Sequence, residues 1–181
     1  MSPIERRLGA AGLVRLLLGY NGSTMNPLNH LHPAVAHFPI ALLIVASITG
    51  VLYLYWQPRA ELRWVTWASM GVGWIACLVA VLTGLVAQSG LPPRPPYALV
   101  INLHIGGGIA ILVCYGILLY RGWIWRQRLR KRTPDAPADF LDNPQARLLI
   151  TLLLILGAAL VVFTGWNGGQ LVYVWGVGVG Q

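Results

Sequence analysis

Four long runs of apolar residues, separated by short polar or charged segments, dominate the sequence. Each run is longer than the roughly 20 residues that a helix needs to cross a bilayer. Pro33 near the start of the first run, and Asp142 or Asn143 before Pro144 at the start of the last, are typical of helix beginnings. The pattern predicts an all-α integral membrane protein, whose transmembrane domain (residues 32–167) is a four-helix bundle. The predicted helices span about residues 33–56, 64–88, 97–122 and 145–166.

The two flanking segments are predicted to lie outside the bundle. Residues 1–31 combine Arg6, Arg7 and Arg15 with short apolar stretches, which favours an amphipathic helix lying in the membrane interface. Residues 168–181 are rich in glycine and alternate with apolar residues, which predicts an irregular or strand-like flap across the outward-facing end of the bundle.

Composition supports a membrane location. The chain is 56% hydrophobic and 10% charged, whereas a soluble domain carries about 25% charged residues. All five acidic residues fall outside the apolar runs, so the runs lack the buried carboxylate typical of proton-coupled pumps. The net charge of +8 indicates a basic membrane face and lipid headgroup contacts, not nucleic-acid binding, because the basic residues cluster beside helix ends.

The distribution of basic residues predicts the orientation. Nine of the thirteen lie on the side of the first turn and of the loop between helices 3 and 4, and four lie on the side of the N-terminus and the tail. By the positive-inside rule this loop is cytoplasmic and both termini face outward, as expected for a protein of the bacterial inner membrane.

His37 and His104 are the candidate functional residues, because an ionisable side chain inside a membrane span is costly and marks a functional site by default. An internal repeat relates them: with His37 placed on His104, Tyr53 falls on Tyr120. Thr83-Gly84 likewise matches Thr164-Gly165. The pattern therefore suggests a duplicated helical hairpin, with the two histidines at similar depth on opposite sides of the bundle axis.

Two imidazoles that face each other across a bundle are the usual axial ligands of haem b, and four-helix bundles build cofactor sites in this way. Gly106, Gly107 and Gly108 would let a flat macrocycle or another helix approach the backbone. Other interpretations remain open: a Zn or Cu ion, a quinone, a chlorophyll-type pigment, or no cofactor, with each histidine bonded to a neighbouring hydroxyl or carbonyl. His30 and His32, at the start of the first helix, fit solvated or capping roles.

The opening His32-Pro33-Ala34-Val35-Ala36-His37-Phe38-Pro39-Ile40-Ala41-Leu42, His104 on the third helix and the tail from Gly168 resemble a known family. It is an uncharacterised family of small four-helix bacterial membrane proteins, classed as a domain of unknown function, and the resemblance covers residues 28–181. Some relatives are joined to Rieske iron–sulfur or cytochrome-like domains, which implies membrane electron transfer. The family pattern often has His or Tyr where this chain has Trp175.

The leading functional hypothesis is a membrane electron-transfer or redox-anchor subunit that binds haem b between His37 and His104, beside Gly107 and Gly108. It would pass electrons between a quinol pool and an outward-facing partner. The alternative is a cofactor-free accessory subunit of a larger respiratory or photosynthetic complex. No constellation of catalytic acid, base and nucleophile occurs in the sequence, so a stand-alone enzyme is not expected.

Overall fold

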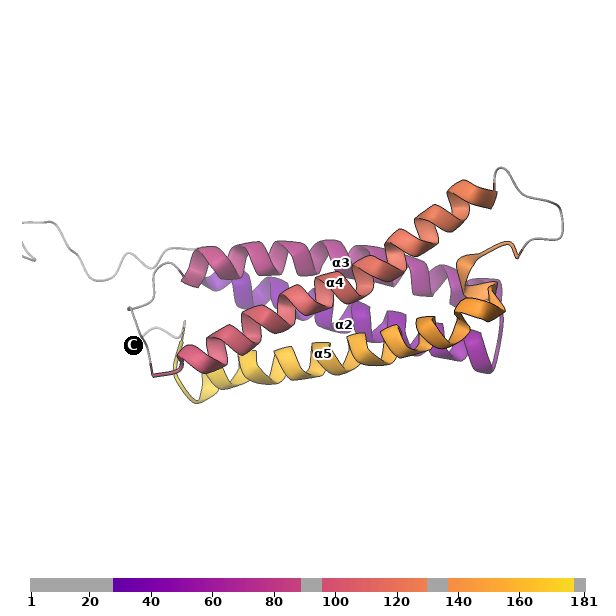
Figure 1. Ribbon diagram of the computed structural model, residues 1–181. Coiled ribbons are helices and arrows are strands. Elements are labelled where there is room, and N and C mark those ends of the chain that lie inside the picture. The colour runs from indigo at the N-terminus through magenta and orange to yellow at the C-terminus, as the bar shows by residue number, and fades with distance from the viewer. Residues whose placement is uncertain (1–27, 89–95, 130–136, 178–181) are drawn as a thin grey trace, which may run out of the picture.

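The chain folds as a bundle of four long helices with two short 3-10 turns, and no strand occurs in the part of the chain described here (Figure 1). The computed structural model describes residues 28–88, 96–129 and 137–177. The elements in chain order are α2 (Leu28–Tyr55), α3 (Ala60–Gln88), α4 (Ala98–Leu129), η1 (Phe140–Asp142), η2 (Pro144–Ala146) and α5 (Arg147–Tyr173).

All four helices are long and apolar enough to span a membrane. Only 22–33% of the most apolar window of each helix is buried inside the bundle. A soluble helix would bury its apolar face against a core, so apolar surface exposed all round indicates helices that face lipid. This confirms the predicted all-α membrane fold.

Consecutive helices run antiparallel and form two hairpins, α2 with α3 and α4 with α5, which also pack against each other through α2–α5 and α3–α4 contacts. The turn after α2 and the segment before α5 lie at one end of the bundle (Figure 1). The starts of α2 and α4 and the end of α5 lie at the other. This pairing of loops and ends agrees with the sequence prediction.

Glycines set the spacing of neighbouring helices. A Cβ atom on Gly73 of α3 would lie 2.9 Å from Leu43 Cδ2 of α2, and one on Gly157 of α5 would lie 2.6 Å from Tyr115 Cζ of α4. In lipid the hydrophobic effect does not drive helices together. Van der Waals contact between small and large residues therefore supplies much of the attraction between them.

A buried hydrogen-bond network joins three helices at the centre of this packing. Ser47 Oγ of α2 lies 2.7 Å from Tyr115 Oη of α4. The Ser47 hydroxyl donates to Leu154 O of α5 at 3.1 Å, and the Tyr115 hydroxyl donates to Leu43 O of α2 at 3.2 Å. Ser47 and Tyr115 therefore satisfy their hydroxyls inside the bundle, as membrane interiors require.

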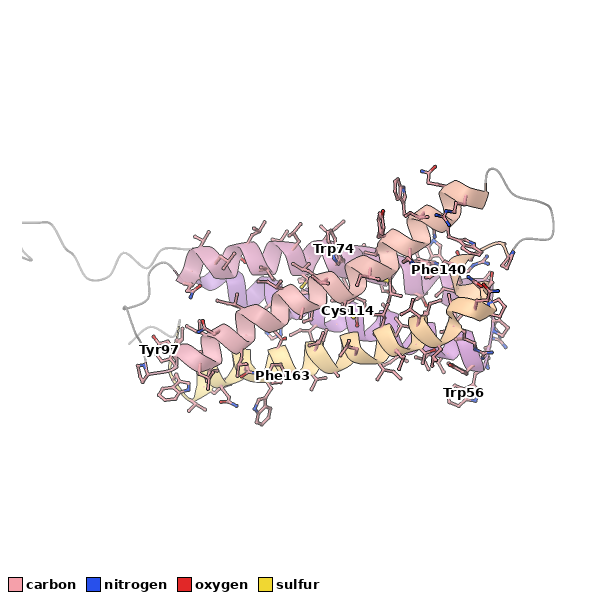
Figure 2. All side chains as sticks on the ribbon, viewed as in Figure 1. Trp56, Trp74, Tyr97, Cys114, Phe140 and Phe163 are labelled. Carbon is pink, nitrogen blue, oxygen red and sulfur yellow. The ribbon has the colours of Figure 1, made fainter. Side chains whose placement is uncertain are left out.

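Aromatic side chains mark both ends of the bundle. Trp56 lies at the end that carries η1, and Tyr97 lies at the opposite end (Figure 2). Trp56 is 73% exposed, and the ring of Tyr97 packs against Trp175 with centroids 5.8 Å apart. Such rings suit the two membrane–water interfaces.

All four helices extend beyond the predicted bounds, and α3 begins at Ala60 and not at residue 64. Helix α2 begins at Leu28 and not at residue 33, and α4 continues to Leu129 through its basic last turns. Helix α5 continues through Gly168 and Gly169 to Tyr173, so the prediction of an irregular tail from residue 168 was wrong for its first six residues.

Helix α5 ends at a glycine in the left-handed region. Gly176 has φ +64°, Val177 N–H donates to Leu171 O at 2.8 Å and Gly176 N–H donates to Val172 O at 3.2 Å. These two bonds close the end of the helical segment, and Gly176 takes the left-handed position there without strain. The predicted interfacial helix of residues 1–31 falls almost entirely outside the described residues.

The residue pairs that suggested an internal repeat lie in different surroundings. Tyr53 is buried and its hydroxyl donates to Asp142, whereas its counterpart Tyr120 is 59% exposed. His37 is exposed and His104 is half-buried. The two-hairpin topology fits a duplication, but paired positions do not have equivalent environments.

Candidate functional site at His104

His104 lies near the start of α4, about 9 Å along the helix axis from Ala98. Its Nδ1 atom is 2.9 Å from the carbonyl oxygen of Thr164 in α5. A carbonyl oxygen can only accept, so Nδ1–H donates this bond. In the neutral imidazole the lone pair is then carried by Nε2, because a bond at one ring nitrogen fixes the tautomer at the other.

Two glycines allow α4 and α5 to meet around this imidazole. A Cβ atom on Gly107 would lie 2.1 Å from Thr164 Oγ1, and one on Gly168 would lie 2.8 Å from His104 Cε1. Any side chain at either position would displace the neighbouring group. Gly107 therefore serves close approach, as the sequence predicted, and the group that approaches it is Thr164 of another helix.

His104 lines a half-open cavity of about 80 Å³ between the four helices. Its walls are almost entirely apolar and include Leu43 of α2, Cys77 of α3 and Gly108 of α4. Thr164 is its second polar residue: its hydroxyl is buried and has no hydrogen-bond partner among the described residues. A buried hydroxyl without a partner is costly, so this group is suited to a ligand.

The other two glycines of the predicted triplet differ from Gly107. A Cβ atom on Gly108 would lie 3.0 Å from Val81 Cγ2, so Gly108 makes room for α3 at the cavity wall. Gly106 is exposed, with open space where a Cβ atom would be.

His37 does not share the cavity with His104. It is exposed on α2, and the cavity face of α2 lies about 110° round the helix from it at 3.6 residues per turn. That face consists of Ala36, Pro39, Ile40 and Leu43. The side chains of His30 and His32 lie outside the described residues.

The residues as arranged do not fit haem b held by two histidines. His104 lines the cavity, whereas His37 is exposed on α2 and does not line it, so the two imidazoles do not face each other across one space. The described residues also contain no group of three or more His, Cys, Asp or Glu side chains that could hold a metal ion. One of the alternative interpretations is confirmed for His104, the hydrogen bond to a neighbouring carbonyl.

Sequence reasoning did not assign Thr164 and Gly168 to the site. Thr164 was noticed only as part of the Thr-Gly pair, and a threonine in an apolar helix usually bonds its own preceding turn. Gly168 was assigned to the tail. Their role depends on which face of α5 meets α4, and the apolar pattern carries no such signal.

Comparisons with known proteins give a family and no closer relative. Searches of curated proteins and of solved structures found no match. A family model described as "Predicted membrane protein (DUF2231)" matches residues 29–181, a range that includes all four helices and the residues around His104. The chain therefore belongs to this family of predicted membrane proteins.

Proposed function

We propose that this chain is a membrane subunit of an electron-transfer assembly and that it binds the headgroup of a quinol or quinone at His104. The observation that carries the proposal is the bond from His104 Nδ1–H to Thr164 O at 2.9 Å. This bond orients the imidazole and makes Nε2 its basic atom. A quinol hydroxyl would donate to Nε2.

The second polar group would contact the other side of the ligand. The buried Thr164 hydroxyl can donate to a carbonyl or ether oxygen of the ring, which would remove the cost of leaving it without a partner. The apolar walls suit the edge of the ring. The cavity is half-open, so the isoprenoid tail would remain in the bilayer.

The depth of the site suits proton release. His104 lies about 9 Å from the start of α4, so a proton accepted from a quinol hydroxyl has a short path to the aqueous phase. Oxidation of the bound quinol would release two protons and pass two electrons to an iron-containing partner subunit. The resemblance to proteins joined to Rieske or cytochrome-like domains supports such a partner.

Binding of quinone analogues tests the proposal. We expect purified wild-type protein in detergent to bind a short-chain benzoquinone or naphthoquinone, detected by quenching of tryptophan fluorescence. A hydrogen bond between neutral groups contributes about 0.5–1.5 kcal/mol, so His104→Ala should weaken binding about threefold to tenfold. Thr164→Val should weaken it severalfold.

His37→Ala is the matched control, because it removes an exposed histidine at similar depth, and it should bind as the wild type does. Equal binding by His104→Ala, or no binding of either analogue by the folded wild type, would overturn the proposal. A reduced-minus-oxidised spectrum with haem supplied tests the original hypothesis separately: a b-type α band lost in both histidine variants would favour haem over quinone.

A specific observation favours a second candidate, the cofactor-free accessory subunit. Asn102 and Gly106 lie one turn apart on α4 and are both exposed, although they belong to a membrane span. Polar and small residues on a transmembrane surface are typical of helix–helix contacts. Co-purification with a larger complex, lost in Asn102→Leu and retained in His104→Ala, would support this candidate.

A further inference from the structure

A second cavity lies at the opposite end of the bundle, where the last turns of α4 diverge from α5 (Figure 1). Its volume is about 300 Å³. Arg121, Trp125 and Arg128 of α4 form one side, and Phe140 at the start of η1 and Asn143 just after it form the other. This cavity is separate from the site at His104.

The cavity carries positive charge that the residues described around it do not neutralise. Arg121 and Arg128 are seven residues apart, so they lie within about 20° on one face of α4 and about 10 Å apart along its axis. Both are exposed, and neither forms an ion pair with any residue in the described ranges.

Two acidic residues at this end already have cationic partners. Asp142 is 3.5 Å from Arg63, and Asp139 is 3.9 Å from Arg126. Two guanidinium groups on one wall of a cavity, with no ion pair inside the described part of the chain, are suited to phosphate, which arginine binds with two parallel hydrogen bonds.

Contacts between uncharged groups hold the residues that line the cavity in place. Trp125 Nε1–H donates to Pro137 O at 3.2 Å, and the rings of Trp125 and Phe140 are 6.0 Å apart. The side-chain oxygen of Asn143 accepts from Gln145 N–H, so its NH₂ group remains as a donor toward a ligand.

The position of the cavity along α4 matches the depth of lipid phosphates. Helix α4 has 32 residues, which at 1.5 Å per residue make about 48 Å, against about 30 Å for the hydrocarbon core. Arg121 comes about 35 Å along this helix, where it leaves the hydrocarbon, and Arg128 lies about 10 Å further out.

An exposed apolar stripe continues from the cavity into the membrane. Ile117 and Val113 precede Arg121 on the same side of α4 and are 42% and 56% exposed. Acyl chains could lie along this stripe while the phosphate occupies the cavity. A free phosphate ion would make no use of it.

We propose that this cavity binds the headgroup of an anionic glycerophospholipid, with Arg121 and Arg128 on the phosphate and the acyl chains along Ile117 and Val113. Basic pockets beside transmembrane helices recognise such headgroups through the same combination of charge and depth. The site is a fixed lipid-binding site, in addition to the general attraction of a basic protein for an anionic leaflet.

Native mass spectrometry of the full chain, with phosphatidylglycerol as the probe and phosphatidylcholine as the reference, tests the proposal. The wild type should retain phosphatidylglycerol in preference to phosphatidylcholine. Each basic residue near a membrane surface contributes enough for about a fivefold change, so Arg121→Gln and Arg128→Gln should each lower this preference about fivefold.

Arg59→Gln is the matched control, since Arg59 is exposed on the turn at the same end but does not line the cavity. An equal loss in Arg59→Gln would show diffuse charge attraction and overturn the site. The Arg121→Lys, Arg128→Lys double variant should retain part of the preference, which separates loss of charge from misfolding. Inorganic phosphate that bound the lipid-free protein through Arg121, with no preference for phosphatidylglycerol, would assign the cavity to a soluble anion and overturn the lipid proposal.

Discussion

At the scale of single residues, glycines control how closely the helices pack. The sequence triplet Gly106, Gly107 and Gly108 predicted close approach, and Gly107 and Gly108 do meet neighbouring helices while Gly106 does not. Gly50, Gly73 and Gly157 serve the same purpose elsewhere, without a distinguishing pattern in the sequence. A lone glycine in an apolar helix does not reveal which face it occupies.

Gly157→Ala tests this role. The added Cβ atom would lie 2.6 Å from Tyr115 Cζ, in a ring that is completely buried. Overpacking of a core costs about 1–3 kcal/mol, which exceeds the gain of up to about 1 kcal/mol in helix propensity. We expect a lower midpoint of thermal unfolding in detergent.

Gly71→Ala is the control, because no atom lies within 4 Å of the position its Cβ would take. It should leave the midpoint unchanged or raise it slightly. If the two variants unfolded at the same temperature, the close contact between Gly157 and Tyr115 would not contribute to the stability of the bundle.

The sequence could not show whether the side chains of the two histidines point into the bundle or away from it. His37 and His104 are surrounded by apolar residues on every side of their helices, since lipid and core both select apolar side chains. The spacing of apolar residues therefore does not show which side of each helix faces the bundle interior. The structure places His104 on the cavity and His37 outside it.

At the scale of elements, the segment before α5 is more structured than its sequence suggested. Asp142 or Asn143 with Pro144 was predicted as the cap and first turn of the last helix. Asn143 instead caps η2 by accepting from Gln145 N–H, and Ala146, before α5, makes no side-chain cap bond. A second cap, Asp139 on η1, was missed. It accepts from Leu141 N–H and also from Trp67 Nε1–H, each at 3.0 Å.

Asp139 therefore links α3 to the segment between α4 and α5, and Asp139→Ala should destabilise the bundle. The variant leaves a tryptophan N–H and a backbone N–H without their acceptor, which costs about 1–3 kcal/mol for a buried group. Unfolding followed by tryptophan fluorescence in detergent measures the loss. Glu61→Ala removes an exposed carboxylate on α3, and a loss as large in that control would contradict a specific role for Asp139.

The existence of four spanning helices could be predicted at this scale, because length and hydropathy alone decide whether a helix can cross a bilayer. Their ends were less predictable. Helix α4 continues through Arg126 and Arg128 because charged side chains are well tolerated once a helix has left the hydrocarbon, and α5 continues through two glycines. The sequence marks where lipid begins more clearly than where a helix ends.

At the scale of the whole molecule, the orientation in the membrane remains a prediction. The end that carries the turn after α2 and the segment before α5 contains most of the basic residues, so it should face the cytoplasm. Gln57→Cys places a thiol at this end and Gly176→Cys places one at the other. The native Cys77 and Cys114 are buried and free, so they should contribute little background.

A membrane-impermeant maleimide applied to intact bacterial spheroplasts should label the thiol at 176 and leave the one at 57 unlabelled. Both should react after the membrane is permeabilised, which controls for accessibility. Labelling of the thiol at 57 in intact spheroplasts would reverse the orientation and place the site at His104 on the cytoplasmic side.

The hydroxyls of Ser47 and Tyr115 have a consequence for tolerance to mutation. The two hydroxyls contact each other, Ser47 also contacts the Leu154 carbonyl, and Tyr115 also contacts the Leu43 carbonyl. These are three oxygen–oxygen contacts, but the two hydroxyls have only two hydrogens between them. One contact is therefore without a hydrogen at every instant, and the two hydrogens can be distributed in more than one way. If either hydroxyl is deleted, the other still has a carbonyl to receive its hydrogen. The centre of the bundle thus contains one more hydrogen-bond acceptor than its two hydroxyl hydrogens need. A variant that lacks either hydroxyl therefore leaves no buried donor without an acceptor.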